Sequence, residues 1–334
     1  MFRFTDIQAA AILAARRSFN EDSAALQANI ARRGEVVGNS IAIPVDAWRR
    51  IDQRAQLIAR SRLSVFNALA AASTIPVSIG DLVNYYPQIS DSNDVTVTMD
   101  GRNSGKADQA NVAYVGTPVP LVATAARFGW RQMAVMMKGG GGIDLATITN
   151  GQRKVAEKLE DMALNGLSSI VVGGSTIYGL RNLPQRNTGN HGFALATTAT
   201  GANWLTAFTQ AINLAIGDNN FGKVTFFVNY GDYVAADTKD YAANYQGTIL
   251  QRLKAINSVQ DIIPASSVPA NEILGVADLG MGEWGGILQA MPLTTRPQAR
   301  SNPEDDYTFQ MMAAAAPQLR YDFSGQSPFV HLSF

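Results

Sequence analysis

The sequence predicts an α+β protein, and three features of the chain support this class. Residues 144–166 place apolar side chains at helical spacing, with charged side chains between them. Residues 76–138 contain β-type runs on both sides of a polar stretch rich in turn formers. Residues 201–334 begin with alternating helix and strand patterns and end with three strand-like segments. The chain is therefore expected to combine a long helix, an extended excursion and a compact α/β unit.

Composition narrows the classes of function. The 334 residues are 46% hydrophobic and only 16% charged, which permits a large core and indicates that much of the surface meets other protein. The formal net charge is zero, so no global basic field indicates nucleic acid. Cysteine is absent, which excludes disulfides and thiol chemistry. No apolar run reaches the roughly 18 residues that a membrane span needs, so no membrane partner is expected.

The N-terminal part is predicted to be helical and basic. Residues 5–33 are predicted to be helical with a break near 18–22, and their start fits an amphipathic or docking helix; a further helix is expected to begin near Pro44 and Asp46. That helix carries five arginines: Arg49, Arg50, Arg54, Arg60 and Arg62. Residues 1–66 hold ten arginines and six acidic residues, a net charge of plus four. Two interpretations stay open, a solvated helical face and a face that meets a polyanion.

Residues 76–138 are predicted to form a long two-stranded excursion with a soft tip near 100–111. The segment after the tip, including residues 132–137, is expected to be extended as well. A long hairpin cannot form its own core. It therefore needs support from another chain or from a distant part of its own chain.

A helix is predicted over residues 145–165, capped by Asp144 and closed by Gly166 in a left-handed conformation. Its apolar stripe consists of Val155, Ala156, Leu159, Met162 and Ala163. Its charged side consists of Arg153, Lys154, Glu157, Lys158, Glu160 and Asp161, which are expected to pair along the helix. The glycine run before it, 139–142, fits a hinge or a phosphate cradle. The missing Gly-Lys-Ser/Thr sequence favours the hinge.

The rest of the chain predicts a compact α/β unit followed by strands. Helices are expected over 204–216, 231–243 and 248–255, with a short hairpin or loop at 170–178. Extended segments are expected over 223–229 and 261–264. The final strands are expected over 286–295, 307–316 and 328–334.

No catalytic constellation emerges from the residues. The chain has two histidines, no Cys/His cluster and no metal-binding motif, so no cofactor or metal is expected. His331 is expected to be a strand residue with a hydrogen-bond partner. The acidic residues 304–306 fit a solvated loop or a divalent cation site. The chain is therefore predicted not to be an enzyme.

The order of these segments resembles one family over about residues 44–334. The segments are PVDAWRRIDQRAQLIAR, the long hairpin, IDLATITNGQRKVAEKLEDMALNG, GLRNLP, NWLTAFTQAINLAIGDNNFGKVTFFVNYGDY and FVHLSF. The family is that of the major capsid proteins of tailed bacteriophages with the Hong Kong 97-type fold, to which the encapsulins are related. The resemblance implies an N-terminal arm at 1–43, an N-terminal helix region at 44–75, an E-loop at 76–138, a peripheral domain at 139–200 with a spine helix at 145–165, an axial domain at 201–285, and return strands of the peripheral domain at 286–334.

The resemblance also implies a function. The chain is expected to self-assemble through pentamers and hexamers into an icosahedral head shell around double-stranded DNA, in a virion assembled in the cytoplasm of a bacterial host. Portal, scaffolding and decoration proteins are the further partners that the family allows. The five arginines between residues 49 and 62 would face the lumen and the DNA. An encapsulin-type compartment around a cargo protein and a soluble α/β enzyme stay open as alternatives.

The E-loop residues expected at subunit contacts are Asp100, Arg102, Lys106 and Asp108. Some members of the family join an E-loop lysine to an asparagine of a neighbouring subunit, and Lys106 would be the donor here. The tip has no apolar residue that could build the dry pocket needed to neutralise the amine. An exposed ion pair of Lys106 is therefore expected instead of a covalent cross-link.

Overall fold

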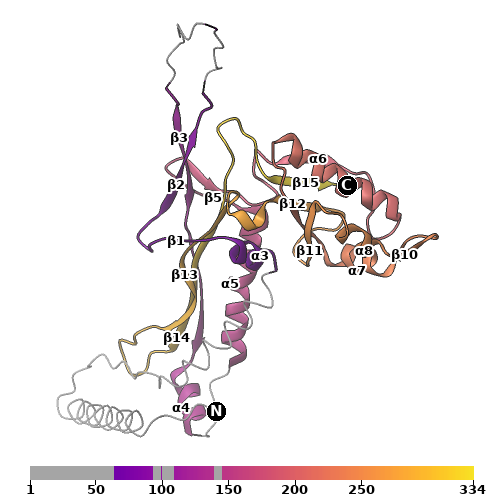
Figure 1. Ribbon diagram of the computed structural model, residues 1–334. Coiled ribbons are helices and arrows are strands. Elements are labelled where there is room, and N and C mark those ends of the chain that lie inside the picture. The colour runs from indigo at the N-terminus through magenta and orange to yellow at the C-terminus, as the bar shows by residue number, and fades with distance from the viewer. Residues whose placement is uncertain (1–63, 93–98, 100–108, 139–144) are drawn as a thin grey trace, which may run out of the picture.

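The computed structural model describes residues 64–92, 99, 109–138 and 145–334. A slender sheet with a long helix beside it forms the body of the molecule (Figure 1). A two-stranded hairpin projects beyond one end of this body, and a compact α/β unit lies to one side. No helix among the described residues is long and apolar enough to cross a membrane.

The helix predicted over 145–165 is confirmed as α5, Leu145–Asn165. All five residues of its predicted apolar stripe are buried. The helix ends at Gly166, whose φ of 66° is the left-handed conformation expected there. A Cβ at Gly166 would lie 2.4 Å from the carbonyl oxygen of Ile177, so only glycine fits this close approach. Asp144 and the glycine run 139–142 lie outside the described residues.

The body is a four-stranded sheet in the order β1-β13-β14-β4. The strands are β1 (Thr74–Pro76), β4 (Leu121–Phe128), β13 (Gly285–Pro297) and β14 (Tyr307–Leu319). β1 pairs in parallel with β13, and the other pairs are antiparallel. Helix α5 packs on β14 and β4, and this contact is part of one of the two hydrophobic cores formed by the described residues. The strands predicted over 286–295 and 307–316 are thereby confirmed.

The hairpin consists of β2 (Val83–Ile89) and β3 (Val112–Pro118), paired in antiparallel register from Val83–Pro118 to Ile89–Val112. It is shorter than the predicted excursion of 76–138, because β4 leaves the hairpin and joins the body sheet. The prediction of an extended segment at 132–137 is wrong, since α4 (Trp130–Lys138) is a helix. Its sequence consists mostly of good helix formers, and the fully buried Met133 holds it against the body.

The α/β unit is built on a five-stranded sheet in the order β11-β8-β12-β15-β7. The strands are β7 (Asn187–Asn190), β8 (Val224–Asn229), β11 (Val259–Ala265), β12 (Ile273–Ala277) and β15 (Phe329–Ser333). The helices are α6 (Gly201–Gly217), α7 (Tyr230–Thr238) and α8 (Ile249–Lys254). Strand β8 is buried on both faces, because Phe226 belongs to the core under α6 while Phe227 belongs to the core shared with the body.

Several short elements complete the described chain. They are α3 (Ser64–Ala72), β5 (Leu167–Val172), β6 (Ser175–Ile177), β9 (Asp240–Ala242), β10 (Tyr245–Thr248) and the 3-10 helix η1 (Leu279–Met281). β5 and β6 form the short hairpin expected near 170–178. The helix expected over 231–243 stops at Thr238, and β9 follows it.

The expectation that all of 286–334 returns to the body is wrong for the last strand. β15 pairs with β12 and β7 and so completes the α/β unit. Strands β12 and β7 were not among the predicted elements. β7, with the sequence NTGN, has no apolar pattern of its own, and its pairing with β15 across more than 100 residues makes it a strand.

Candidate interaction surface

One face of the β2–β3 hairpin exposes a row of apolar side chains. By the register of the pair, Tyr85, Pro87 and Ile89 lie on the same face as Val112 and Tyr114. All five residues are exposed, and the exposed fraction is 62% for Ile89 and 68% for Tyr114. None of them is charged, and we call this set the hairpin face. Exposed apolar side chains gathered on one face of a strand pair mark an interaction surface.

The opposite face of the same hairpin is fastened to the chain's own body. Gln88 donates from Nε2 to the carbonyl oxygen of Tyr321 at 2.8 Å, and Gln318 donates from Nε2 to the carbonyl oxygen of Asn84 at 3.2 Å. The ring of Tyr86 meets the ring of Tyr321 edge to face at 6.4 Å. Burial raises the pKa of Tyr86 to about 12. The base of the hairpin is thus held in a fixed direction while the hairpin face stays open.

The turn between β5 and β6 packs under the inner end of the hairpin face. A Cβ at Gly116 would lie 2.5 Å from Oγ of Ser175 and 2.7 Å from the ring of Tyr85. The absence of a side chain at Gly116 therefore lets the two hairpins touch. Beyond this contact, toward the tip, the hairpin face has no partner among the described residues of the chain.

The predicted E-loop residues Asp100, Arg102, Lys106 and Asp108 lie outside the described residues. The hairpin face was not predicted as a set. Its signal in the sequence is the alternation of large apolar residues at 85, 87 and 89 and again at 112 and 114. Register was needed to show that both alternations lie on one face, because a shift by one residue would place them on opposite faces.

The predicted lumen-facing residues Arg49, Arg50, Arg54, Arg60 and Arg62 also lie outside the described residues. Helix α3 begins directly after that segment, and Glu160 of α5 holds its first turn. The Glu160 carboxylate accepts from the backbone N–H groups of Val65 and Phe66 at 3.1 and 3.0 Å. It also accepts from Oγ of Ser64 at 3.3 Å and from Oγ of Ser267 at 2.8 Å.

The prediction that Glu160 pairs along its own helix is therefore wrong. Glu160 is only 4% exposed and caps a different helix, a position that a carboxylate favours because the helix N-terminus is partly positive. The same prediction is confirmed for Glu157, which pairs with Arg153 at 2.7 Å and Lys154 at 2.9 Å. Hydrogen bonds from Lys154 and Arg153 lower the pKa of Glu157. Asp161 likewise pairs with Lys158 at 2.7 Å.

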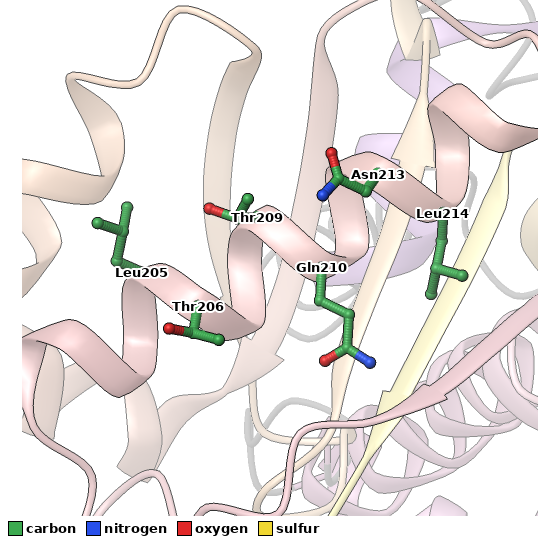
Figure 2. A pocket seen from close by; sticks show the side chains of 6 residues that line it. All are labelled: Leu205, Thr206, Thr209, Gln210, Asn213 and Leu214. Carbon is green, nitrogen blue, oxygen red and sulfur yellow. The ribbon is translucent and has the colours of Figure 1, made fainter.

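A second uncharged surface lies along α6. A shallow groove of about 500 Å³ follows its outer side (Figure 2). The groove is lined by Leu205, Thr206, Thr209, Gln210, Asn213 and Leu214. None of these side chains is ionisable, and the 17 residues of α6 include no charged residue. The groove therefore offers methyl, hydroxyl and amide groups and no acid or base.

The acidic residues 304–306 form a turn. Asp305 accepts from the backbone N–H groups of Ser301 and Asn302 at 3.0 and 2.7 Å, and these bonds lower the pKa of Asp305. Within the part of the chain that the structure describes, no group of three or more His, Asp or Glu side chains could hold a metal ion. Glu304 and Asp306 are exposed, as expected for the solvated loop, one of the two interpretations of this cluster.

Comparison with known proteins gives the family and the fold. The profile of a family of unknown function, DUF6260, matches residues 38–332, and the chain belongs to this family. No curated protein matches the chain.

Three solved structures illustrate the likeness of fold. The virus-like particle from Pyrococcus furiosus has 13% sequence identity and a TM-score of 0.60, and the match covers 86% of this chain and 99% of that one. The capsid of Myoviridae phage XM1 has 11% identity and a TM-score of 0.63, with 81% and 91% covered. The capsid of a native GTA particle has 15% identity and a TM-score of 0.56, with 81% and 90% covered. The chain has the α+β fold of these shell proteins, the Hong Kong 97-type fold that the sequence predicts.

Proposed function

We propose that this protein is the major capsid protein of a tailed bacteriophage, which self-assembles into an icosahedral head shell enclosing double-stranded DNA. The observation that carries the proposal is the hairpin face, held outward by its anchored base on a fold shared with shell proteins. The role is structural rather than catalytic, and the place of action is the virion, assembled in the cytoplasm of the bacterial host.

The energetics of the hairpin face favour a second copy of the chain as its partner. Full burial of a large apolar side chain contributes about 1.5–3 kcal/mol, so the four large side chains of the hairpin face that are half or more exposed represent a large unused contribution. These are Tyr85, Ile89, Val112 and Tyr114. An uncharged face needs an uncharged partner, because an unpaired charge buried against it would be costly. Repeated many times over a closed shell, contacts of this modest size suffice without any single strong one.

The remaining functional assignments belong to the same proposal. The regions at 1–43, 44–75 and 201–285 act as arm, N-terminal helix region and axial domain. Of the predicted region 76–138, the part up to the end of β3 acts as the E-loop, because β4 joins the body sheet. Of the predicted region 139–200, α5, β5 and β6 belong to the peripheral domain, whereas β7 belongs to the sheet of the axial domain. Asp100, Arg102, Lys106 and Asp108 lie at subunit contacts, without a covalent cross-link at Lys106. The five arginines between 49 and 62 face the lumen and neutralise DNA phosphates. Pentamers and hexamers form the shell, with portal, scaffolding and decoration proteins as further partners.

A compartment of the encapsulin type, enclosing a cargo protein, is the second candidate. It is favoured by the match to the virus-like particle from Pyrococcus furiosus, because that match covers 99% of the other chain. The N-terminal arm that the resemblance implies at 1–43 would favour the phage.

Electron microscopy of the purified full-length chain tests the proposal. Closed, regular shells are expected, and a protein that stays monomeric at high concentration would overturn it. The contents separate the two candidates. Nuclease-protected DNA in particles from infected or induced cells supports the phage, whereas a single co-purifying protein inside the shell supports the compartment.

A further inference from the structure

Four side chains form a continuous polar chain where the α/β unit meets the end of α5. Arg181 donates from Nε and Nη2 to the two carboxylate oxygens of Glu272 at 2.7 and 2.8 Å. Nε2 of His331 lies 3.2 Å from Oε2 of Glu272, and Nε of Arg186 donates to Nδ1 of His331 at 3.2 Å. We call this set the junction chain.

The junction chain connects three parts of the fold. The backbone N–H of Arg181 donates to the carbonyl oxygen of Leu164, and Nη1 of Arg181 donates to Oδ1 of Asn165, so Arg181 is tied to the end of α5. Glu272 lies directly before β12, and His331 lies on β15. Arg186 lies directly before the edge strand β7 and also donates to the carbonyl oxygen of Leu183. The side chains of the junction chain thus link the end of α5 to the residue before the edge strand β7.

The hydrogen bonds set the protonation state of His331. A guanidinium Nε can only donate, so Nδ1 of His331 must be an acceptor and carries no proton. Nε2 then carries the proton and donates to Glu272. Across the sheet, the neighbours of His331 are Leu274 on β12 and Thr188 on β7, which are uncharged. The charged groups that face the imidazole are Glu272, Arg186 and Arg181.

Local electrostatics keep the imidazole neutral and the carboxylate ionised. Burial lowers the pKa of His331 and outweighs the opposing effect of Glu272, while Arg186 and Arg181 lower it further. Burial would raise the pKa of Glu272, but the hydrogen bonds and charge of Arg181, together with His331, bring it below its usual value. The junction chain with all its hydrogen bonds is therefore the one with a neutral imidazole and an ionised carboxylate.

We propose that the junction chain is a proton-sensitive latch, closed when His331 is neutral and opened on the β7 side when Nδ1 takes up a proton from solvent. The new N–H bond uses the lone pair that accepted from Arg186, so two donors and two positive charges then face each other. The bond from Nε2 to Glu272 persists, because the imidazolium and carboxylate attract. Arg186 then loses its side-chain bond to His331 on β15, while the backbone pairing of β7 with β15 remains. This property is independent of the proposed role in a shell.

The sign of the pH effect follows from linkage. His331 has a lower pKa in the folded chain than in the unfolded one, so the unfolded state binds more protons between these two values. The stability that the neutral form contributes is present above about pH 6.5 and is lost as the pH falls through the folded pKa. One such proton raises the unfolding equilibrium constant by up to about tenfold per pH unit.

Urea unfolding of the full-length chain between pH 7.0 and 5.0, followed by tryptophan fluorescence, tests the latch. The comparison uses wild type, His331→Asn and His331→Gln, with His191→Gln as the control, since the chain has only two histidines. Asparagine keeps an acceptor near Arg186 and glutamine keeps a donor near Glu272, and neither titrates. The test compares how the free energy of unfolding of each variant changes with pH, so the variants need not be equally stable. The other titrating groups are common to all variants and contribute equally to that change.

The latch predicts that the wild type and His191→Gln lose stability steeply below pH 6.5, while both His331 variants lose it less steeply. A purely structural role of His331 would lower stability by the same factor at every pH and would overturn the proposal. So would a pH dependence that disappears in His191→Gln. Arg186→Met should weaken the pH dependence as well, because it removes the cation that opposes protonation.

Discussion

Replacement of Glu160 by alanine should destabilise the chain far more than the same change at Glu157, one turn earlier on α5. Both are glutamates of the same helix, three residues apart. Glu160 is 4% exposed and accepts four hydrogen bonds from α3 and Ser267. The side chain of Glu157 is 36% exposed and pairs with two cations on the surface.

The magnitude follows from what each substitution leaves behind. Glu160→Ala leaves the buried backbone N–H groups of Val65 and Phe66 without their acceptor, at about 1–2 kcal/mol each after partial relaxation. It also removes a negative charge from the N-terminus of α3, worth about 0.3–1 kcal/mol. The total is about 3 kcal/mol, or roughly a hundredfold in the unfolding equilibrium constant. Glu157→Ala removes only exposed helix pairs, worth about 0.3–0.5 kcal/mol.

Equilibrium urea unfolding of the two variants and the wild type at pH 7 provides the measurement. Glu160→Gln is a third, isosteric variant, in which the amide nitrogen must face a backbone N–H. The free energy of unfolding that it loses should therefore lie between the losses of Glu157→Ala and Glu160→Ala. If Glu160→Ala and Glu157→Ala lower the free energy of unfolding by similar small amounts, the capping role derived from the hydrogen bonds is refuted. Glu160→Ala and Glu157→Ala replace the same residue type within the same helix, so the change in helix propensity is the same for both and cancels in the comparison.

Three further predictions concern the surface and the backbone. Tyr114→Asp should place a charge on the hairpin face and prevent shell formation without changing the unfolding of the subunit. The control Tyr230→Asp, at a tyrosine on α7 that is 59% exposed, should still assemble. Normal yields of Tyr114→Asp shells in electron microscopy would exclude the hairpin face as a contact. Arg49→Ser, Arg50→Ser and Arg54→Ser combined should reduce DNA retained in particles while empty shells still form, and unchanged retention in a nuclease-protection assay would place these arginines away from DNA. Gly166→Ala should lower the free energy of unfolding by about 1–3 kcal/mol, because alanine must adopt a positive φ and place its Cβ close to the carbonyl oxygen of Ile177. The control is Gly217→Ala, where a Cβ meets no atom within 4 Å, and it should change the urea midpoint little.

Local patterns in the sequence were sufficient for the elements whose character depends on their own residues. The bounds of α5, the burial of its stripe and the left-handed Gly166 follow from helical periodicity and glycine chemistry within 23 residues. Strand β8 was predicted because its run VTFFVN is apolar on both faces. The order of such segments along the chain carried the resemblance that implied the Hong Kong 97-type fold.

Contacts between distant residues decided the rest. Nothing near Glu160 in the sequence distinguishes it from Glu157, because the N–H groups that it accepts from lie 94 and 95 residues away. The polar sequence NTGN of β7 is a strand only because β15 pairs with it, and β15 belongs to the α/β unit because it also pairs with β12. The hairpin face, likewise, exists only in the register of β2 with β3. Periodicity is a local property of a chain, whereas the partner of a strand edge or a carboxylate is chosen by packing over the whole fold, so the sequence by itself determined which segments are apolar and helical, and the tertiary structure decided what each of them faces.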